Sequence, residues 1–328
     1  MPSKMPNKML NKMPSKMRQP STIAVIGGTG FIGRQIVEAL ARQGARIKVL
    51  ARNADRAKFL KPMGEVGQIS IISGSALDDA ALDEVMSGCN AVINTIGILS
   101  ESGAQRFASL QAELPGRIGQ RAAQNNMSAV VHLSAIGADL NSPSRYAQTK
   151  AKGEVALREA FPDAIVLRPS LVFGTGDGFF NRFAAMAVMA PGLPLIGGGT
   201  NKMQPVYVGD VAAAVVAVLA SPKARGKTYE LGGPAVMRFR DAMAYILKQT
   251  KRRRLLIPVP HAVMNIAASA MAILPNPPVT RDQLKLLKVD NIVAEDALEL
   301  RDLGIDPTPI ELIVPSYLER YQPGGRFA

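Results

Sequence analysis

The chain is 328 residues long, enough for one large core or two smaller ones, and no segment of it is long and apolar enough to cross a membrane. One cysteine, Cys89, excludes an intrachain disulfide and fits a reducing compartment, and two histidines without a cysteine cluster make a metal site unexpected. The formal charge of +13 stays positive without the first 20 residues, which indicates an acidic partner such as anionic lipid or nucleic acid, unless the whole proteome is basic.

Lysine and methionine each recur every fourth residue in positions 1–17, and three prolines oppose a helix there. We therefore expect residues 1–20 to form a disordered basic arm. The arm lacks the continuous apolar core of a signal peptide, and its charge suits lipid headgroups. Alternatively, Met17 is the true start and the arm is absent from the mature protein.

Residues 23–44 show the pattern of a strand, a glycine turn and a helix. The apolar run 23–26 (IAVI) suits a buried strand, glycines follow at spacings of three, and apolar residues then recur at helical spacing as far as Gly44. In such a turn Gly27, Gly30 and Gly33 allow a sharp bend, a close approach of backbone N–H groups to a pyrophosphate, and tight packing of the helix. The pattern predicts dinucleotide binding, the alternative being an ordinary glycine-rich turn.

Strands and helices alternate through the first half of the chain. Expected strands are residues 46–51, 68–72, 91–96, 129–133 and 164–167, and expected helices are residues 78–86, 107–126 and 146–161. This alternation is typical of an α/β fold with a doubly wound parallel sheet of the Rossmann type.

The alternation weakens after the sixth strand, where prolines and glycines interrupt the apolar segments. A helix at 211–220 and a strand at 228–231 still belong to the sheet-forming pattern. We therefore expect a Rossmann-type NADP-binding domain over residues 21–233, with residues 171–203 contributing to the substrate side, and a smaller, mostly helical C-terminal lobe over residues 234–328.

Two unusual segments lie in the expected C-terminal lobe. Residues 248–254 include five basic side chains, for which a solvated rim is the plain explanation; no aromatic residues lie between them, so stacking on nucleic acid bases is not expected. Residues 262–274 are apolar over most of a helix circumference but too short to span a bilayer. Such a segment is buried in the lobe's own core, against a partner or at a lipid interface.

Arg52 ends the second expected strand, 19 residues after Gly33. An acidic residue at this place holds the ribose 2′-hydroxyl of NAD, whereas an arginine suits the 2′-phosphate of NADP. The two residues that follow, Asn53 and Ala54, are not acidic either. The sequence therefore predicts NADPH as the cofactor, the alternative being an arginine that simply faces solvent.

Tyr146 and Lys150 lie four residues apart, on one face of the helix that follows the fifth strand. A lysine ammonium beside a phenol lowers the pKa of the phenol, and the same ammonium can hydrogen-bond a ribose. In a dinucleotide fold such a tyrosine can act as a general acid toward a carbonyl that receives hydride.

Several motifs resemble those of the extended and atypical short-chain dehydrogenase/reductases, from about residue 21 to the C-terminus. They are the glycine turn, NTIG at 94–97, Tyr146 with Lys150, RPSLVFG at 168–174 and YVGD at 207–210. The runs 145–183, 228–234 (TYELGGP) and 279–287 (VTRDQLKLL) are similar to the dehydrogenase-like accessory subunits of respiratory complex I. This resemblance implies a tightly held NADPH without known turnover, near the place where the hydrophilic arm meets the membrane.

The turn and the resemblance together assign the residues expected to contact the cofactor. They are Gly27, Thr29, Gly30, Phe31, Ile32, Gly33, Arg52, Ser75, Asn94, Gly97, Ser134, Tyr146, Lys150 and Pro169. There are two departures from the family pattern: Ala135 and Ile136 stand where a catalytic hydroxyl is expected, and Ser75 replaces an acidic residue that contacts adenine. Losing one donor to a substrate oxyanion lowers rates by about 10²–10³ in comparable sites, so we expect no catalytic residue unless Tyr146 and Lys150 are active.

The sequence therefore favours an NADPH-binding, non-catalytic accessory subunit of respiratory complex I. Its expected partners are core subunits near the quinone site and the membrane arm, with anionic lipid as a further contact and no nucleic acid. Its expected place is the cytoplasmic face of a bacterial inner membrane or the equivalent matrix side of a mitochondrion. The alternatives are an active NADPH-dependent reductase or epimerase for a small carbonyl or sugar nucleotide, and an NADPH-dependent redox-sensing regulator.

Overall fold

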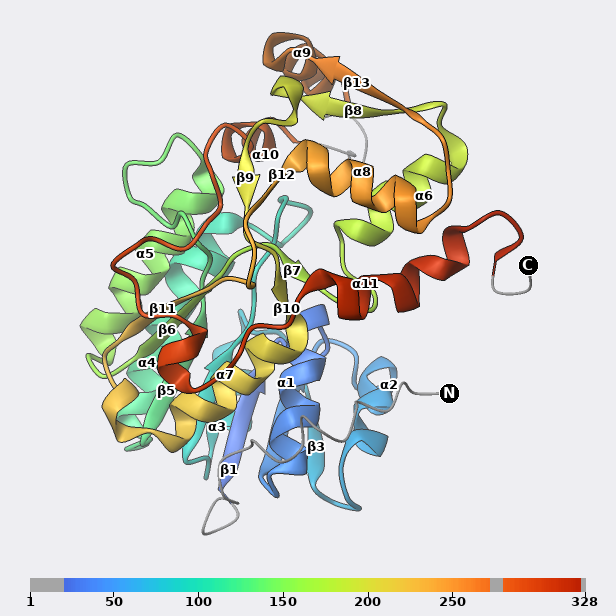
Figure 1. Cartoon of the computed structure of the whole chain (residues 1–328). Coiled ribbons are helices and arrows are strands. Elements are labelled where there is room, and N and C mark those ends of the chain that lie inside the picture. Colours follow the sequence, from blue (N-terminus) through green and yellow to red (C-terminus); the bar gives the residue numbers. More distant parts are fainter. Residues whose placement is uncertain (1–20, 272–279, 326–328) are drawn as a thin grey trace.

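A computed structural model describes residues 21–271 and 280–325, so the expected basic arm, residues 1–20, lies outside the described part. A seven-stranded parallel sheet forms the centre, in the order β11-β6-β5-β4-β1-β2-β3 (Figure 1). Its strands are β1 (Thr22–Ile26), β2 (Arg46–Ala51), β3 (Ile69–Ser73), β4 (Ala91–Asn94), β5 (Ala129–Leu133), β6 (Ile165–Pro169) and β11 (Thr228–Leu231). The predicted doubly wound α/β fold is confirmed.

Helices cover both faces of this sheet. The helices on one face are α1 (Phe31–Arg42) and α7 (Val208–Ala220), and those on the other are α3 (Asp79–Met86), α4 (Leu114–Gln124) and α5 (Arg145–Ala160). α1 and α7 lie side by side in Figure 1, and both bury apolar side chains against the strands. Because both faces are covered, a strand such as β5 is buried along its whole length and shows no alternation of apolar and polar residues.

The strand order of the sheet reverses at β1. This strand pairs with β2 on one side and with β4 on the other, so the chain leaves the centre of the sheet in both directions. In open sheets of this kind, ligands bind beyond the C-terminal ends of the strands at the point of reversal. The glycine turn follows β1 and therefore lies at this point.

The helix expected over residues 107–126 is divided. A π-helical turn over Ala108–Glu113 precedes α4, which begins at Leu114. Pro115 lies in the first turn of α4, where its missing N–H is tolerated. On the facing helix α5, Gly153 packs so closely that a Cβ there would run into the carbonyl oxygen of Gln111 in the π-helical turn. The division therefore falls where α5 approaches this segment.

A second core lies at one end of the main sheet (Figure 1). Its helices are α6 (Phe180–Met189), α8 (Phe239–Gln249) and α11 (Ile310–Leu318). Phe173, Phe180 and Phe239 are its largest fully buried side chains, and the rings of the first two meet edge to face with their centroids 6.0 Å apart. The predicted helical C-terminal lobe is confirmed in this region.

The C-terminal lobe also contains strands that the sequence did not predict. β13 (Leu255–Val259) pairs in parallel with β8 (Gly192–Ile196), and β12 (Met237–Arg238) pairs with β9 (Lys202–Met203). Each of these two sheets has two strands among the described residues, so one edge of β13 forms no ladder hydrogen bonds. Pro258, which lacks an N–H, is tolerated in such an edge strand. Because the run LLIPV is short and contains a proline, its pattern did not distinguish a strand from a loop.

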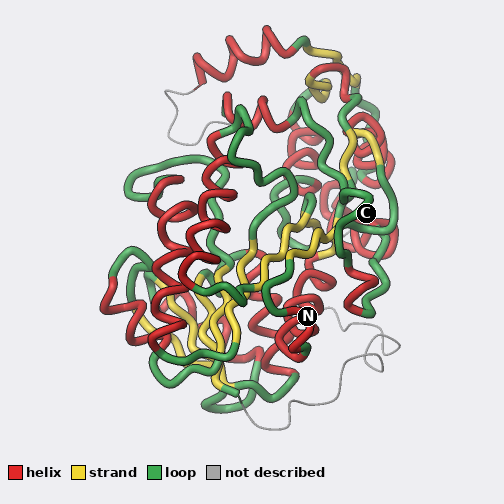
Figure 2. The backbone as a smooth tube through the Cα atoms, turned by 90° about the vertical axis from the view of Figure 1, so that its left-hand side faces the viewer, coloured by secondary structure: helices red, strands yellow, loops and turns green. Residues whose placement is uncertain are grey.

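The remaining elements complete the lobe and its links to the sheet. They are α2 (Ala54–Ala57), β7 (Val172–Phe173), β10 (Val206–Tyr207), α9 (His261–Met271), α10 (Arg281–Leu286) and short 3-10 turns at Lys58–Met63, Gly197–Gly199, Pro222–Ala224, Leu300–Leu303 and Glu319–Tyr321. Figures 1 and 2 place α9 at the far end of the molecule, beyond β8 and β13. The apolar segment 262–274 begins in α9, and its residues 272–274 lie outside the described part.

The chain returns from the C-terminal lobe to the main sheet near residue 300. Leu300 is fully buried in the core around the sheet, and Leu298 forms a parallel bridge with Tyr229 of β11. The expected domain boundary between residues 233 and 234 stays a prediction, since the chain that follows it contributes to both cores.

Candidate functional site

The glycine turn joins β1 to α1 where the strand order reverses. Gly27 adopts a φ of +89°, a conformation that other residues rarely take, and its carbonyl accepts from the N–H of Gly30 at 3.0 Å. A Cβ at Gly33 would run into the same carbonyl oxygen, so α1 lies directly against the turn. The first turn of α1 has no acidic residue, which leaves its unpaired N–H groups and its positive dipole end for an anion.

Arg52 directly follows β2 and is exposed. Asn53 caps α2 by accepting from the N–H of Arg56 at 2.9 Å, and the next acidic residue, Asp55, pairs with Lys58 at 2.7 Å. Within the described part of the chain, Arg52 itself has neither a hydrogen bond nor an ion pair. Its guanidinium therefore remains available for an anion, and its contact with a 2′-phosphate stays a prediction.

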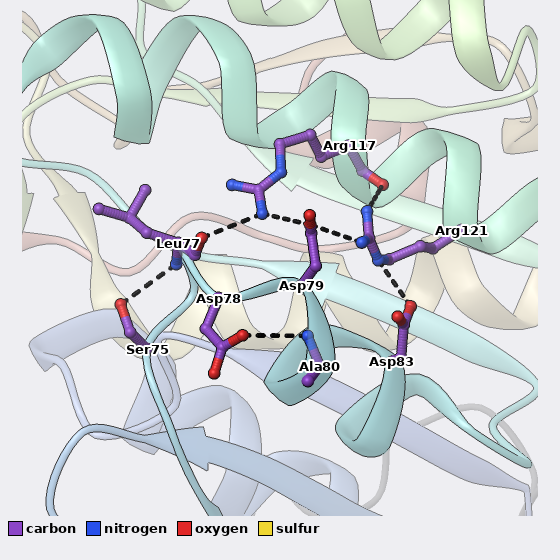
Figure 3. Close-up of polar contacts among 8 residues, drawn as sticks. All are labelled: Ser75, Leu77, Asp78, Asp79, Ala80, Asp83, Arg117 and Arg121. Carbon is purple, nitrogen blue, oxygen red and sulfur yellow. Dashed lines mark hydrogen bonds and ion pairs between the residues drawn. The ribbon is translucent and has the colours of Figure 1, made fainter.

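Arginines of α4 fix the loop that follows β3 and contains Ser75 (Figure 3). The Ser75 hydroxyl accepts from the N–H of Leu77 at 3.2 Å, and Arg117 donates to the Leu77 carbonyl at 3.1 Å and also pairs with Asp79. Arg121 binds the same Asp79 carboxylate at 2.5 Å. The loop thus has a defined shape, while the contact of Ser75 with adenine stays a prediction.

The loop after β4 faces the glycine turn. The buried Asn94 amide lies 3.2 Å from Nδ1 of His132, and its oxygen accepts from the N–H of Ile96 at 3.1 Å. Asn94 therefore shapes the loop, which brings Gly97 so near to Lys150 that a Cβ there would lie 3.2 Å from Nζ. The direct contacts of Asn94 and Gly97 with a cofactor stay predictions.

Lys150 is buried between the ends of β4 and β5. Its Nζ donates to the carbonyl of Leu133 at 2.9 Å and lies 3.4 Å from that of Ile96, so an ammonium with three N–H groups keeps one for another acceptor. The neighbouring Ser134 hydroxyl is buried and has no partner among the described residues, which suits a polar ligand. Lys150 and Ser134 together fit the hydroxyl groups of a ribose.

Tyr146 and Lys150 lie on one face of α5, but burial governs their proton affinities. Burial raises the pKa of Tyr146 to about 12. Burial also lowers the pKa of Lys150 to about 8, against the opposing effect of the Glu154 carboxylate. The expected lowering of the phenol pKa by Lys150 is therefore not found, because burial, which disfavours the phenolate, accounts for the whole shift.

The other predicted residues lie around the same edge of the sheet. Thr29 is exposed in the turn, whereas Phe31 and Ile32 are half-buried at the start of α1. Pro169 is buried at the end of β6, and its carbonyl accepts from the N–H of Ile136 at 3.1 Å. Thr29, Phe31 and Ile32 thus lie in the turn or directly after it, whereas β4 and β5 separate Pro169 from β1 in the sheet. The contacts of these residues with a cofactor stay predictions.

One residue that holds the site together, Asp282 of α10, is not among the sequence predictions. Its carboxylate accepts from the Ser144 hydroxyl at 2.7 Å and from the backbone N–H groups of Arg145 and Tyr146 at 2.8 and 2.9 Å. Asp282 lies 136 residues from Tyr146 along the chain, so no spacing rule connects them. The run 279–287 includes Asp282, but its pattern alone gives no chemical signal.

Two features are not found in the described part. Among its residues, His, Cys, Asp and Glu side chains form no group of three or more that would hold a metal ion. Over residues 21–271 and 280–325, no helix has the length and apolarity that crossing a membrane requires. The polar groups that converge are those around the glycine turn, Lys150 and Ser134.

Comparison with known proteins assigns the family. Residues 23–232 match the model of the NAD dependent epimerase/dehydratase family, and this range includes the glycine turn, Tyr146 and Lys150. The chain therefore belongs to this family, whose name states its nicotinamide cofactor. The predicted resemblance to dehydrogenase-type Rossmann proteins is confirmed.

Within this family, the chain is similar to named subunits of a respiratory enzyme. It is 34% identical to NADH dehydrogenase (ubiquinone) 1 alpha subcomplex subunit 9, mitochondrial, of Arabidopsis thaliana, over 92% of this chain and 78% of that protein. It is 32% identical to the protein of the same name from Mus musculus, over 91% of this chain and 80% of that protein. The predicted similarity to accessory subunits of complex I is confirmed.

Solved structures share the fold. The NADPH-dependent quinone oxidoreductase of Escherichia coli, complexed with NADPH, matches this chain with a TM-score of 0.69 and 20% identity, over 90% of this chain and 99% of that one. At this level of identity the likeness shows the fold alone. The chemistry of the site must therefore be argued from the residues of this chain.

Proposed function

We propose that the protein is an NADPH-binding accessory subunit of respiratory complex I that turns over no substrate. The observation that supports this most is the extent of the similarity to the alpha subcomplex subunit 9 of Arabidopsis. It covers 92% of the chain and so reaches past the family range 23–232 into the C-terminal lobe. A shared cofactor domain alone would not require likeness in the lobe.

The cofactor would bind across the end of the sheet. The glycine turn would hold the pyrophosphate, Arg52 the 2′-phosphate, and Lys150 with Ser134 the nicotinamide ribose. A charged hydrogen bond from arginine to phosphate favours NADPH over NADH. When bound, NADPH supplies a hydride, but the residues near Tyr146 do not favour its use.

Two features of the site oppose rapid turnover. Ala135 and Ile136 follow Ser134 where family enzymes have a hydroxyl, so one donor to a substrate oxygen is absent. The raised pKa of Tyr146, about 12, makes its phenol a weak acid at neutral pH. The cofactor would then be structural, stabilising the fold by about 2.7 kcal/mol at a hundredfold excess over its Kd.

The C-terminal lobe offers a surface for a hydrophobic partner. Leu255 and Ile257 of β13 and Val263 and Ile266 of α9 are exposed, the last by 73%, and we call these four residues the apolar patch. In the preceding basic cluster, Arg252 and Arg254 donate to backbone carbonyls of the lobe. The other members, Lys248, Lys251 and Arg253, are exposed and have no side-chain partner among the described residues.

We infer that the apolar patch meets the membrane arm of the complex and that Arg253 faces anionic headgroups. A basic residue near such a surface contributes about 1 kcal/mol within a Debye length. The protein would then lie on the matrix side of the mitochondrial inner membrane, or on the cytoplasmic face of a bacterial one. Core subunits near the quinone site would be its neighbours.

Binding and turnover assays on the purified protein test the non-catalytic proposal. We expect calorimetry to detect NADPH binding, and a screen of aldehydes, ketones and sugar nucleotides to show no rapid NADPH oxidation. The second candidate function, an NADPH-dependent reductase, is favoured by the placement of Tyr146 and Lys150 on one face of α5. A substrate turned over at about 10 s⁻¹, a typical enzyme rate, and lost in Tyr146→Phe, would establish that reductase instead.

A further inference from the structure

The α10 helix is fastened to the start of α5. Asp282 Oδ2 accepts from the Ser144 hydroxyl at 2.7 Å and from the N–H of Tyr146 at 2.9 Å, while Oδ1 accepts from the N–H of Arg145 at 2.8 Å. The first N–H groups of a helix have no partner within the helix, and its dipole favours a negative charge there. A carboxylate of the C-terminal lobe thus completes the helix that presents Tyr146 and Lys150.

Two neighbours of Asp282 bind other loops at the site. Lys285 Nζ donates to the carbonyl of Pro143 at 2.9 Å, just before α5. Gln283 Nε2 lies 3.3 Å from the carbonyl of Leu99, two residues after Gly97 in the loop that follows β4. α10 therefore bridges both segments that surround Lys150.

The other side of α10 packs against α9. Leu284 is buried with Ala268 of α9 and Ile196 at the end of β8, and Met264 and Leu287 pack around them. Met264 lies between Val263 and Ile266, two exposed residues of the apolar patch. The short helix α10 therefore contacts α5 on one side and α9, which carries two residues of the apolar patch, on the other.

We propose that Asp282 is a positioning residue for α5. Through α10, the binding of NADPH then orders α9 and the apolar patch. This inference rests on the proposed NADPH binding. When NADPH fixes Lys150 and the loop after β4, the contacts of Asp282, Gln283 and Lys285 hold α10, and α10 holds α9. Because such coupling is reciprocal, a partner docked on the patch strengthens NADPH binding by the same factor.

Hydrogen exchange of the full chain, with and without NADPH, tests the coupling. We expect NADPH to slow amide exchange in the glycine turn, in the first turn of α5, in α10 and in α9. The α8 helix serves as an internal reference, because it belongs to the lobe and packs against α6 and α11. Protection of the glycine turn with unchanged exchange in α10 and α9 would overturn the coupling and leave the cofactor proposal intact. No protection anywhere would refute NADPH binding itself.

The variant Asp282→Asn tests the positioning residue. It keeps the size of the side chain but removes the charge, and we expect it to weaken NADPH about fivefold or more, at the low end of coupling between sites. It should also abolish the slowed exchange in α9 while the glycine turn stays protected. The matched control is Asp241→Asn, whose carboxylate accepts from the N–H of Arg238 at the start of α8. Equal weakening of NADPH by both variants, or unchanged affinity in Asp282→Asn, would contradict the proposal.

Discussion

At the scale of single residues, we expect Arg52 to decide whether the site prefers NADPH or NADH. Its side chain has no partner among the described residues, since Asn53 caps α2 and Asp55 pairs with Lys58. A charge-assisted hydrogen bond to phosphate contributes about 1.5–3 kcal/mol. We therefore expect Arg52→Ala to weaken NADPH about tenfold or more and to leave NADH nearly unchanged, as measured by calorimetry.

The control for this variant is Arg56→Ala, which removes an exposed arginine of the same region whose backbone N–H, rather than its side chain, contacts Asn53. It should leave both affinities unchanged. Equal affinities of the unmodified protein for NADPH and NADH would show that Arg52 does not read the 2′-phosphate.

Lys150 makes the stability of the protein without NADPH depend on pH, and the sign of this dependence follows from its pKa. Its pKa is about 8 in the folded state and near 10.5 in the unfolded chain, because burial disfavours the ammonium. Between pH 8 and pH 10.5 the unfolded chain binds more protons than the folded protein does. The free energy of unfolding that Lys150 contributes therefore rises as the pH increases through this range. Below pH 8 both states are charged, and the cost of burying the charge is fully present.

We expect Lys150→Met to remove this dependence. Urea unfolding without NADPH should show the variant gaining most over the unmodified protein near pH 7, with that advantage shrinking by about 2 kcal/mol between pH 8 and pH 10. Taking the difference between the two proteins cancels the other titrating groups, including Tyr146. An advantage that does not change with pH would mean that Lys150 is not charged and buried as described.

At the scale of elements, the glycine turn and α1 depend on one close contact. A Cβ at Gly33 would run into a backbone carbonyl, which cannot rotate away as a side chain can. We expect Gly33→Ala to cost about 1–3 kcal/mol of stability in urea unfolding and to abolish detectable NADPH binding. Gly178→Ala is the control, since a Cβ there would meet nothing within 4 Å. Equal effects of the two variants would contradict the described turn.

The sheet and its helices follow from local patterns, so the sequence predicts them well. β1 and β5 are mostly apolar runs, and β2 carries two basic residues among apolar ones. The structure places all three strands within one residue of the expected bounds. The π-helical turn before α4 was missed, because the chain stays helical through it and only its hydrogen bonds change from i→i+4 to i→i+5. β13 was missed because Pro258 argues against a strand unless the strand forms a two-stranded ribbon.

The site is only partly readable from the sequence. Gly27 belongs to a glycine pattern that suits a phosphate-binding turn, and Lys150 follows Tyr146 at helical spacing. Both patterns can be recognised in the sequence. Asp282 acts across 136 residues, and only the folded chain shows that it meets Tyr146. The raised pKa of Tyr146 likewise depends on burial, which neighbouring residues along the chain do not determine.

At the scale of the whole molecule, the apolar patch should hold the protein to its complex. Val263 and Ile266 are 53% and 73% exposed, so replacing both with serine removes little from the core of the lobe. We expect Val263→Ser with Ile266→Ser to release the protein from detergent-solubilised membranes, as followed by native electrophoresis. Leu312→Ser on α11, at a residue 65% exposed, is the matched control and should change nothing. Retention of the double variant would place the contact elsewhere.

The most direct test of the account is to isolate the protein from its native membranes in mild detergent and identify both its companions and its bound nucleotide. The account predicts that it migrates with the subunits of respiratory complex I and that alkaline extraction, which preserves the reduced nicotinamide, releases NADPH in a one-to-one ratio with the chain. A protein recovered free of complex I subunits in the soluble fraction at low salt, and without bound nucleotide, would contradict it.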